Sequence, residues 1–407
     1  MSMFVSPSLR EAVRLPAPRR AAPSIALALG ALLALAGCEE EKKASTSVVD
    51  AGADSGRTSI DPKLAAAVAA AAAATSTAKT DAGSGTGPPE SGVFGPGGAD
   101  AAHLKGTPAK VELMGEGAEP RTALKVDLAS DAEQKTTITV GFRLNAQPVM
   151  PNMDITLSVK TDKPKADKPK ANNKKKEPEV KAPELPAGSH AMIASVADAM
   201  LSAKQPGAIP KEVGDQVKKL KGSQIRFALS ENGSGTGYTV ELAKGAEPHL
   251  DAALQAAAEA MSIMTVPLPS KPVGVGAYWL TTDRSDSFGI NVVRYRVFRV
   301  EKIDKNNVTV AIECRQWAAD PRINLPLGAE QTELSVQQFE SQGKGQALLA
   351  GASFISNGGD IKQTTQTVVL IARPGQQPQP APIQTELTGK LVTAALVNEK
   401  PAAPQTP

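Results

Sequence analysis

Few side chains in this 407-residue chain have the type and spacing that covalent or metal chemistry requires. The two cysteines are Cys38 and Cys314, and the three histidines are His103, His190 and His249. The histidines are scattered and have no companion at ligand spacing, so we expect no metal site. The chain contains no P-loop and no H-E-x-x-H, C-x-x-C or G-x-S-x-G pattern. We therefore expect no catalytic residues, no cofactor and no enzyme, which leaves the thiol of Cys38 as the reactive group.

Cys38 stands where a secretory signal would be cut. Four arginines between positions 10 and 20 precede an apolar run over residues 21–36, and the small residues of the sequence LAG precede the cysteine. A basic segment, a short apolar core and small residues at the cut are typical of a signal peptide. The sequence LAGC resembles the lipobox of bacterial lipoproteins. In that family the thiol receives a diacylglycerol and the chain is cut just before it, so the resemblance implies that Cys38 is lipidated.

Lipidation at Cys38 would attach the protein stably to a membrane, because two or more acyl chains are enough for permanent anchoring. The residue after Cys38 is Glu39 and not Asp. By the sorting rule of enterobacterial lipoproteins this indicates the outer membrane, and we expect the protein at its periplasmic face. Residues 1–37 carry four Arg and one Glu, a net charge of +3 that equals the net charge of the whole chain. The mature protein is therefore close to neutral, and no nucleic-acid partner is expected.

Two polar stretches and a tail frame the expected folded body. Residues 38–105 are rich in Ala, Gly, Ser, Thr and Pro and offer little apolar surface to bury, which predicts a disordered tether. Residues 161–188 contain the doubled pentad DKPKA and eight Lys against five acids. Closely spaced Pro residues favour extended conformers there. We expect this insert to be disordered, either as a solvated loop between two strands or as a basic arm that contacts anionic lipopolysaccharide, phospholipid or cell-wall polymer. Residues 398–407 form a tail.

The body, residues 106–397, reads mainly as strands. Apolar and polar residues alternate with a period of two over residues 124–128, 138–144, 153–159, 225–229, 238–242, 293–297 and 308–314, and apolar residues recur over 383–391. One apolar and one polar face per strand is typical of an antiparallel sheet that is solvated on one side. We predict a mainly β (α+β) fold, with a large curved antiparallel sheet or half-barrel and two covering helices. Cys314 has apolar parity within its strand, which favours a buried, inert thiol.

Two segments carry helical spacing instead. One has apolar residues at Val213 and Val217, and the other at Leu250, Leu254 and Met261. Each follows a proline, which suits a first helical turn. These stripes either cover the apolar face of the sheet as part of the core, or form a lid over a cavity and line a ligand.

Residues 266–279 read VPLPSKPVGVGAYW and run into a strand. This segment resembles one found in β-rich lipoproteins of myxobacteria and relatives, whose body has no assigned function. In architecture the body also resembles the half-barrel of lipoprotein carriers, which bind acyl chains. That resemblance implies a non-catalytic binder of an acyl chain or other apolar ligand. The alternatives are a structural or protein-interaction module of the envelope and, ranked last, a hydrolase without a recognisable motif.

Overall fold

The computed structural model describes residues 89–126, 128, 133–162, 185–203, 210–305, 307–323, 333–350 and 353–393. Cys38, the expected signal over residues 1–37, the expected tail and most of the expected tether lie outside these ranges, as do residues 163–184 of the Lys/Pro-rich insert. None of the helices in the described ranges is long and apolar enough to cross a membrane.

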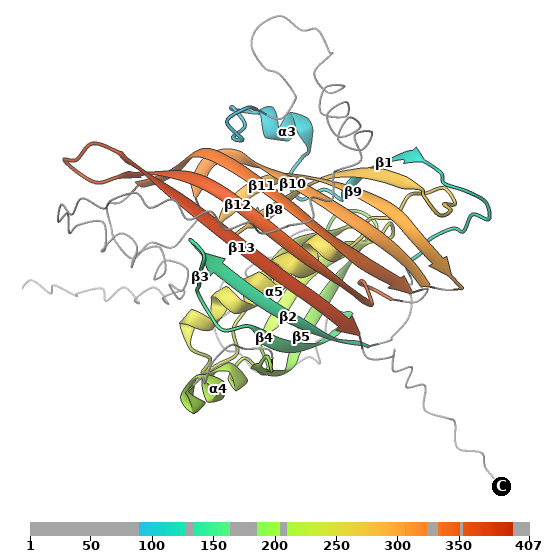
Figure 1. Cartoon of the computed structure of the whole chain (residues 1–407), viewed down its shortest axis with the longest axis horizontal. Coiled ribbons are helices and arrows are strands. Elements are labelled where there is room, and N and C mark those ends of the chain that lie inside the picture. Colours follow the sequence, from blue (N-terminus) through green and yellow to red (C-terminus); the bar gives the residue numbers. More distant parts are fainter. Residues whose placement is uncertain are drawn as a thin grey trace, which may run out of the picture.

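One antiparallel sheet contains every described strand (Figure 1). The strands are β1 (Lys110–Gly115), β2 (Gln134–Leu144), β3 (Gln147–Pro148), β4 (Met153–Thr161), β5 (Ser189–Leu201), β6 (Gln224–Ser230), β7 (Gly235–Glu241), β8 (Tyr278–Ser287), β9 (Ile290–Asp304), β10 (Asn307–Ile323), β11 (Glu333–Ala350), β12 (Gly358–Ala372) and β13 (Gln379–Thr393). The helices are α3 (Gly98–Ala102), α4 (Lys211–Lys218) and α5 (Asp251–Met264), with a 3₁₀ turn, η1, at Pro248–Leu250.

The sheet has 13 strands in the order β1-β8-β9-β10-β11-β12-β13-β2-β4-β5-β6-β7, with β3 paired to β2. It is not closed into a barrel, which confirms the predicted fold class. The sheet curves far enough that the starts of its two edge strands meet, because the amide of Ala109 donates to Ser234 Oγ at 3.2 Å. Figure 1 shows α5 running between strands β8–β13 and strands β2, β4 and β5.

Helix α5 fills the concave side of this sheet. Twelve of its fourteen residues are buried, including Leu254 and Met261, and it contacts β2, β7, β11, β12 and β13. A helix enclosed on all sides is buried all round and shows no single apolar stripe. Small residues allow the close approach: a Cβ added at Gly389 of β13 would lie 2.6 Å from the Cβ of Ala260. Helix α5 thus covers the apolar face of the sheet by packing directly against it.

Helix α4 forms where the sequence predicts it, between β5 and β6. It packs against β5, and its buried residue is Val217, while Val213 is half-buried. Val217 and the following Leu220 belong to the same apolar core as α5. Helix α4 therefore contributes one corner of the core, and α5 contributes its centre.

The chain from residue 89 to 105, which we expected to be part of the tether, is instead packed on the sheet. Phe94 is buried against strands β8–β10 on the convex side, and α3 follows it. Val93 bridges to Ala318 of β10, and the amide of Phe339 in β11 donates to the carbonyl of Ser91. The tether boundary predicted from composition is therefore wrong here. The buried Phe94 and three backbone hydrogen bonds to β10 and β11 hold this segment on the sheet despite its Gly- and Pro-rich composition.

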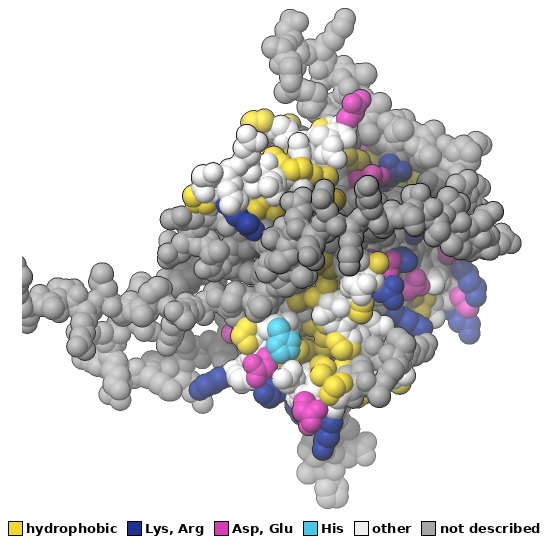
Figure 2. Space-filling model, turned by 60° about the vertical axis from the view of Figure 1, so that its left-hand side comes forward, with side chains coloured by type: hydrophobic (Ala, Val, Ile, Leu, Met, Phe, Trp, Pro, Cys, Tyr) yellow, Lys and Arg dark blue, Asp and Glu magenta, His cyan; other side chains and the backbone are white. Residues whose placement is uncertain are grey.

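Three further segments refine the strand predictions. Residues 123–126 alternate in sequence but form no strand. Residues 191–201 belong to β5, and β4 and β5 pair directly, so the Lys/Pro-rich insert joins two adjacent strands. Figure 2 shows hydrophobic side chains at the surface among charged ones. The large exposed apolar side chains are scattered along the chain: Leu104, Met114, Leu185, Met200, Val275 and Val392.

Candidate functional site

A pocket of about 270 Å³ lies at the end of the sheet where α5 stops. Its walls come from the chain after α5, the start of β10, the end of β11, the turn before β12 and residues 122–126. The lining residues are Thr122, Ala123, Leu124, Lys125, Val126, Gly233, Thr265, Val266, Leu268, Lys305, Val308, Leu349, Ala350, Ser353, Phe354, Ile355 and Ser356.

The inner wall of the pocket is held by the extended chain that follows α5. The amide of Thr265 donates to the carbonyl of Met261 and closes the helix. The amide of Leu268 then donates to the carbonyl of Asn232, and the indole of the buried Trp279 donates to the carbonyl of Pro267 at 2.8 Å. The PLP sequence at residues 267–269 cannot continue a helix, so the chain stays extended and presents Val266 and Leu268 to the pocket.

The hydroxyl groups of Thr265, Ser353 and Ser356 in the pocket wall already donate to the protein. Ser356 Oγ donates to the carbonyl of Met264 and Ser353 Oγ to that of Ala350, both at 2.6 Å. Thr265 Oγ1 donates to the carbonyl of Met261 at 2.8 Å. With these donors used, the inner surface offered to a ligand is mainly apolar, as is usual in pockets that hold apolar ligands.

A second, larger groove of about 720 Å³ lies toward the opposite ends of β11–β13. Its lining includes Gln338, Gln366 and Gln384 from three neighbouring strands, but also Phe339, Val368 and Ile383. This mixed lining differs from the mainly apolar lining of the first pocket.

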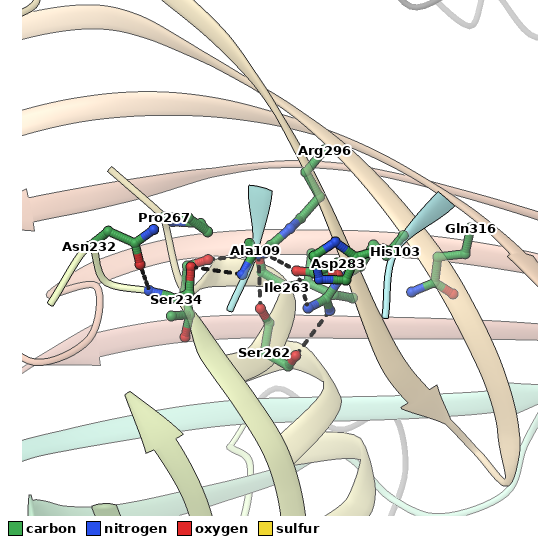
Figure 3. Close-up of polar contacts among 12 residues, drawn as sticks. His103, Ala109, Asn232, Ser234, Ser262, Ile263, Pro267, Asp283, Arg296 and Gln316 are labelled. Carbon is green, nitrogen blue, oxygen red and sulfur yellow. Dashed lines mark hydrogen bonds and ion pairs between the residues drawn. The ribbon is translucent and has the colours of Figure 1, made fainter. Parts of the chain in front are cut away.

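Beside the first pocket, a buried charge cluster holds the end of α5 (Figure 3). Arg296 Nη1 donates to the carbonyls of Ser262, Ile263 and Thr265 at 3.1, 3.1 and 2.7 Å. The last carbonyls of a helix have no partner within the helix, and a cation there also suits the helix dipole. Arg296 therefore caps a buried helix end.

Asp283 fixes the two arginines of this cluster. Its carboxylate accepts from Arg294 Nε at 2.8 Å and Nη2 at 3.1 Å, and from Arg296 Nη2 at 2.5 Å. All three side chains are at most 2% exposed. Arg294 Nη1 also donates to Ser262 Oγ of α5 at 3.0 Å. One carboxylate thus neutralises one guanidinium group and orients both.

The register of the strands aligns these groups into two polar rows on the concave face. One row runs Asp283, Arg294, Gln316, Ser341 and Thr365 across β8–β12. The other runs Thr281, Arg296, Cys314, Gly343 and Gln363 across the same strands.

Hydrogen bonds link the two rows and the helix. Gln363 Nε2 donates to Gln316 Oε1 at 2.9 Å, and Gln316 Nε2 donates to Glu259 of α5 at 3.2 Å. Thr281 Oγ1, Arg296 Nε and Gln363 Oε1 are buried without a hydrogen-bond partner among the described residues, and all three lie in the second row. The second row therefore contains more buried polar atoms without a hydrogen bond than the first row.

Burial and charge act in opposite directions on the ionisable groups of this cluster. Burial favours the neutral acid at Asp283, but the guanidinium groups of Arg294 and Arg296 outweigh it and lower the pKa. At Glu259 burial dominates and raises the pKa. Burial likewise lowers the pKa of Arg296 and raises that of Cys314 to about 12. The cluster thus shifts the pKa values of its two carboxyl groups in opposite directions: the pKa is lowered at Asp283 and raised at Glu259.

Four of the five residues predicted from the sequence lie in the core, the fifth, Val213, is half-buried on α4, and none of the five lines the pocket. Leu250, Leu254, Met261 and Val217 are buried in the main apolar core, and none of them lines the pocket. Cys314 is buried as its parity predicts. No group of three or more His, Cys, Asp or Glu in the described ranges could hold a metal ion.

Sequence reasoning missed the buried cluster, although a signal was present. In the run NVVRYRVFRV, Arg294 and Arg296 share parity with the apolar residues Val292, Phe298 and Val300. Charges with apolar parity in an otherwise apolar strand indicate a buried, paired site. The pocket had no comparable signal, because its walls come from five separate segments.

No family model and no curated protein matches this chain. A structure of lipovitellin, solved for its lipid–protein interactions, overlaps 69% of this chain and 27% of its own, with 10% identity and a TM-score of 0.37. A structure of OccAB2 from Acinetobacter baumannii overlaps 64% of this chain and 98% of its own, with 7% identity and a TM-score of 0.11. This chain spans about a quarter of the lipovitellin chain it overlaps. Both likenesses are too low to support an argument about function.

Proposed function

We propose that this protein is a lipid-anchored protein of the bacterial outer membrane, facing the periplasm, that binds a small apolar ligand such as an acyl chain without catalysis. The observation that carries the proposal is the pocket at the end of α5, with buried apolar walls and hydroxyl groups already bonded to the protein. The anchor is the lipidated thiol of Cys38, supported by the LAGC sequence at the end of the signal.

The size of the pocket limits what the protein carries. Its volume of about 270 Å³ lies just below the range of about 300–1,000 Å³ typical of small-molecule pockets. Helix α5 occupies the rest of the concave side, so no larger cavity continues from the pocket into the described core. The proposed ligand is therefore one acyl chain or a molecule of similar size, and not a multi-chain lipid.

A pair of variants at the end of β11 tests the ligand proposal. Leu349 lines the pocket, whereas its neighbour Leu348 has the opposite parity and does not. Replacing Leu349→Trp fills the pocket with an indole, and Leu348→Trp adds the same group outside it. Native mass spectrometry of residues 38–407 carrying Cys38→Ser should detect a bound acyl chain, which Leu349→Trp removes and Leu348→Trp retains. A protein that carries no ligand and binds no apolar probe would contradict the proposal.

The anchor is tested separately from the ligand. In the full chain, Cys38→Ser should release the protein from membranes and abolish palmitate labelling, because the thiol is the acylation site. Continued labelling of that variant would show that the lipid is attached elsewhere.

The second candidate function is a structural or protein-interaction module of the envelope. The packing of α5 favours it, since a filled concave face is a feature of a scaffold. Photo-crosslinkers placed at Gln366 and Gln384 of the second groove should then capture one defined envelope protein in membranes, whereas the ligand proposal requires no such partner.

A further inference from the structure

We infer that the ligand of this pocket is a single-chain amphiphile with an anionic carboxylate headgroup, held with its chain inward and its headgroup at the mouth. This inference rests on the proposed function and adds the charge and the orientation of the ligand. It starts from the charges of the lining: among the 17 lining residues that the structure describes, Lys125 and Lys305 are ionisable, and none is an Asp or a Glu.

The two lysines and the apolar walls occupy different depths. Lys125 and Lys305 are exposed. The apolar lining residues Val266, Val308 and Phe354 are 5%, 4% and 2% exposed. The pocket is thus apolar inside and cationic at its opening. An amphiphile matches this gradient, because its chain leaves water while its charged group stays hydrated.

The ammonium groups of both lysines are available to a ligand. Lys305 lies in the turn between β9 and β10, where the nearby Lys302 pairs with Asp304 at 3.5 Å. Neither Lys305 nor Lys125 forms an ion pair with any described residue. They come from segments 180 positions apart in the chain (305 − 125), so the fold brings two cations to one opening.

The orientation follows from the cost of burying charge. A carboxylate placed at the inner end would lie among Val266, Leu268 and hydroxyl groups that already donate elsewhere. Burying an unpaired charge there is strongly unfavourable. At the mouth the same carboxylate meets two lysines in water, where each exposed ion pair adds modest affinity. The lysines therefore select the headgroup, and the apolar walls supply the main binding.

Photo-crosslinking of the full chain tests the inference. The protein is placed by its own anchor in uncharged phosphatidylcholine vesicles and exposed to diazirine-tagged palmitic acid or to the methyl ester of the same probe. Mass spectrometry then locates the labelled peptides. The acid should label peptides that contain Val308 or Phe354, and Lys125→Gln with Lys305→Gln should reduce that labelling by about threefold to tenfold. Labelling by the uncharged ester should not change with this double substitution.

A control and two outcomes separate the inference from the proposed function. Lys302→Gln removes a lysine near the end of β9 that does not line the pocket, so it should leave labelling unchanged. If acid and ester label the pocket equally and the double variant has no effect, the headgroup inference falls while the apolar-ligand proposal stands. If neither probe labels the pocket, both fall. Because the lysines are exposed, their replacement should leave folding intact, and the melting temperature verifies this.

Discussion

Replacing Asp283→Asn should destabilise the folded protein by about 3–5 kcal/mol, the usual cost of removing one partner from a buried ion pair. The carboxylate accepts three N–H groups from Arg294 and Arg296, and all three side chains are at most 2% exposed. Without it, two guanidinium groups remain buried, with Glu259 as the nearby carboxyl group in the cluster. Since the total stability of a domain is about 5–15 kcal/mol, this single change removes about a fifth or more of it.

Urea unfolding followed by tryptophan fluorescence measures this loss, because Trp279 is buried in the neighbouring part of β8. At an m-value of about 3 kcal/mol/M, the midpoint should fall by about 1–1.7 M. Asp320→Asn is the matched control: Asp320 pairs with Arg322, whose side chain is 80% exposed, so its loss should cost under about 1 kcal/mol. Equal midpoints for Asp283→Asn and the wild-type protein would show that the cluster does not hold the end of α5.

Three further outcomes are expected. The raised pKa of Glu259 means that stability falls as pH rises from the unfolded-state value through the folded one. The stability of Glu259→Gln relative to the wild-type protein should therefore increase as pH rises above the usual pKa of a glutamate, and a pH-independent difference in urea midpoint would contradict this. Gly389→Ala places a methyl group 2.6 Å from the Cβ of Ala260 and should lower the free energy of unfolding by about 1–3 kcal/mol. Gly358→Ala, with 3.7 Å to its nearest neighbour, should lower it less in the same urea experiment. Cys314, whose pKa is raised to about 12, should resist thiol reagents in native Cys38→Ser protein and react in urea; rapid native reaction would mean that the strand opens.

Periodicity alone was enough to predict the class of the fold, because each alternating strand must bury one face. It failed for residues 123–126, where an alternating sequence lines a pocket and pairs with no strand. It also overlooked β11 and β12, whose inward positions include Gly343, Gly345 and Gln363 in place of large apolar residues. At Gly345 a Cβ would lie 2.0 Å from the carbonyl oxygen of Asp360 on β12, and this close approach of two strands leaves no local pattern in the sequence.

The helical stripe at Leu250, Leu254 and Met261 predicted an amphipathic cover, yet α5 is enclosed on all sides. The apolar composition of its remaining positions, mostly Ala, was the sign of that enclosure. The lysines of the pocket mouth could not be paired from sequence, since nothing local relates position 125 to position 305.

The place of β13 in the sheet has a consequence for how the protein is made. This last described strand is flanked by β12 and β2, near the middle of the strand order, so it joins strands β8–β12 to strands β2 and β4–β7. Its pairing with β2 links Thr385 to Leu144, residues 241 positions apart (385 − 144). Chain ends usually tolerate truncation, but removal of residues 379–393 would split the sheet and uncover α5. The sheet therefore cannot be completed until residues 379–393 have been synthesised. Pairing between residues so far apart in the sequence is also slow.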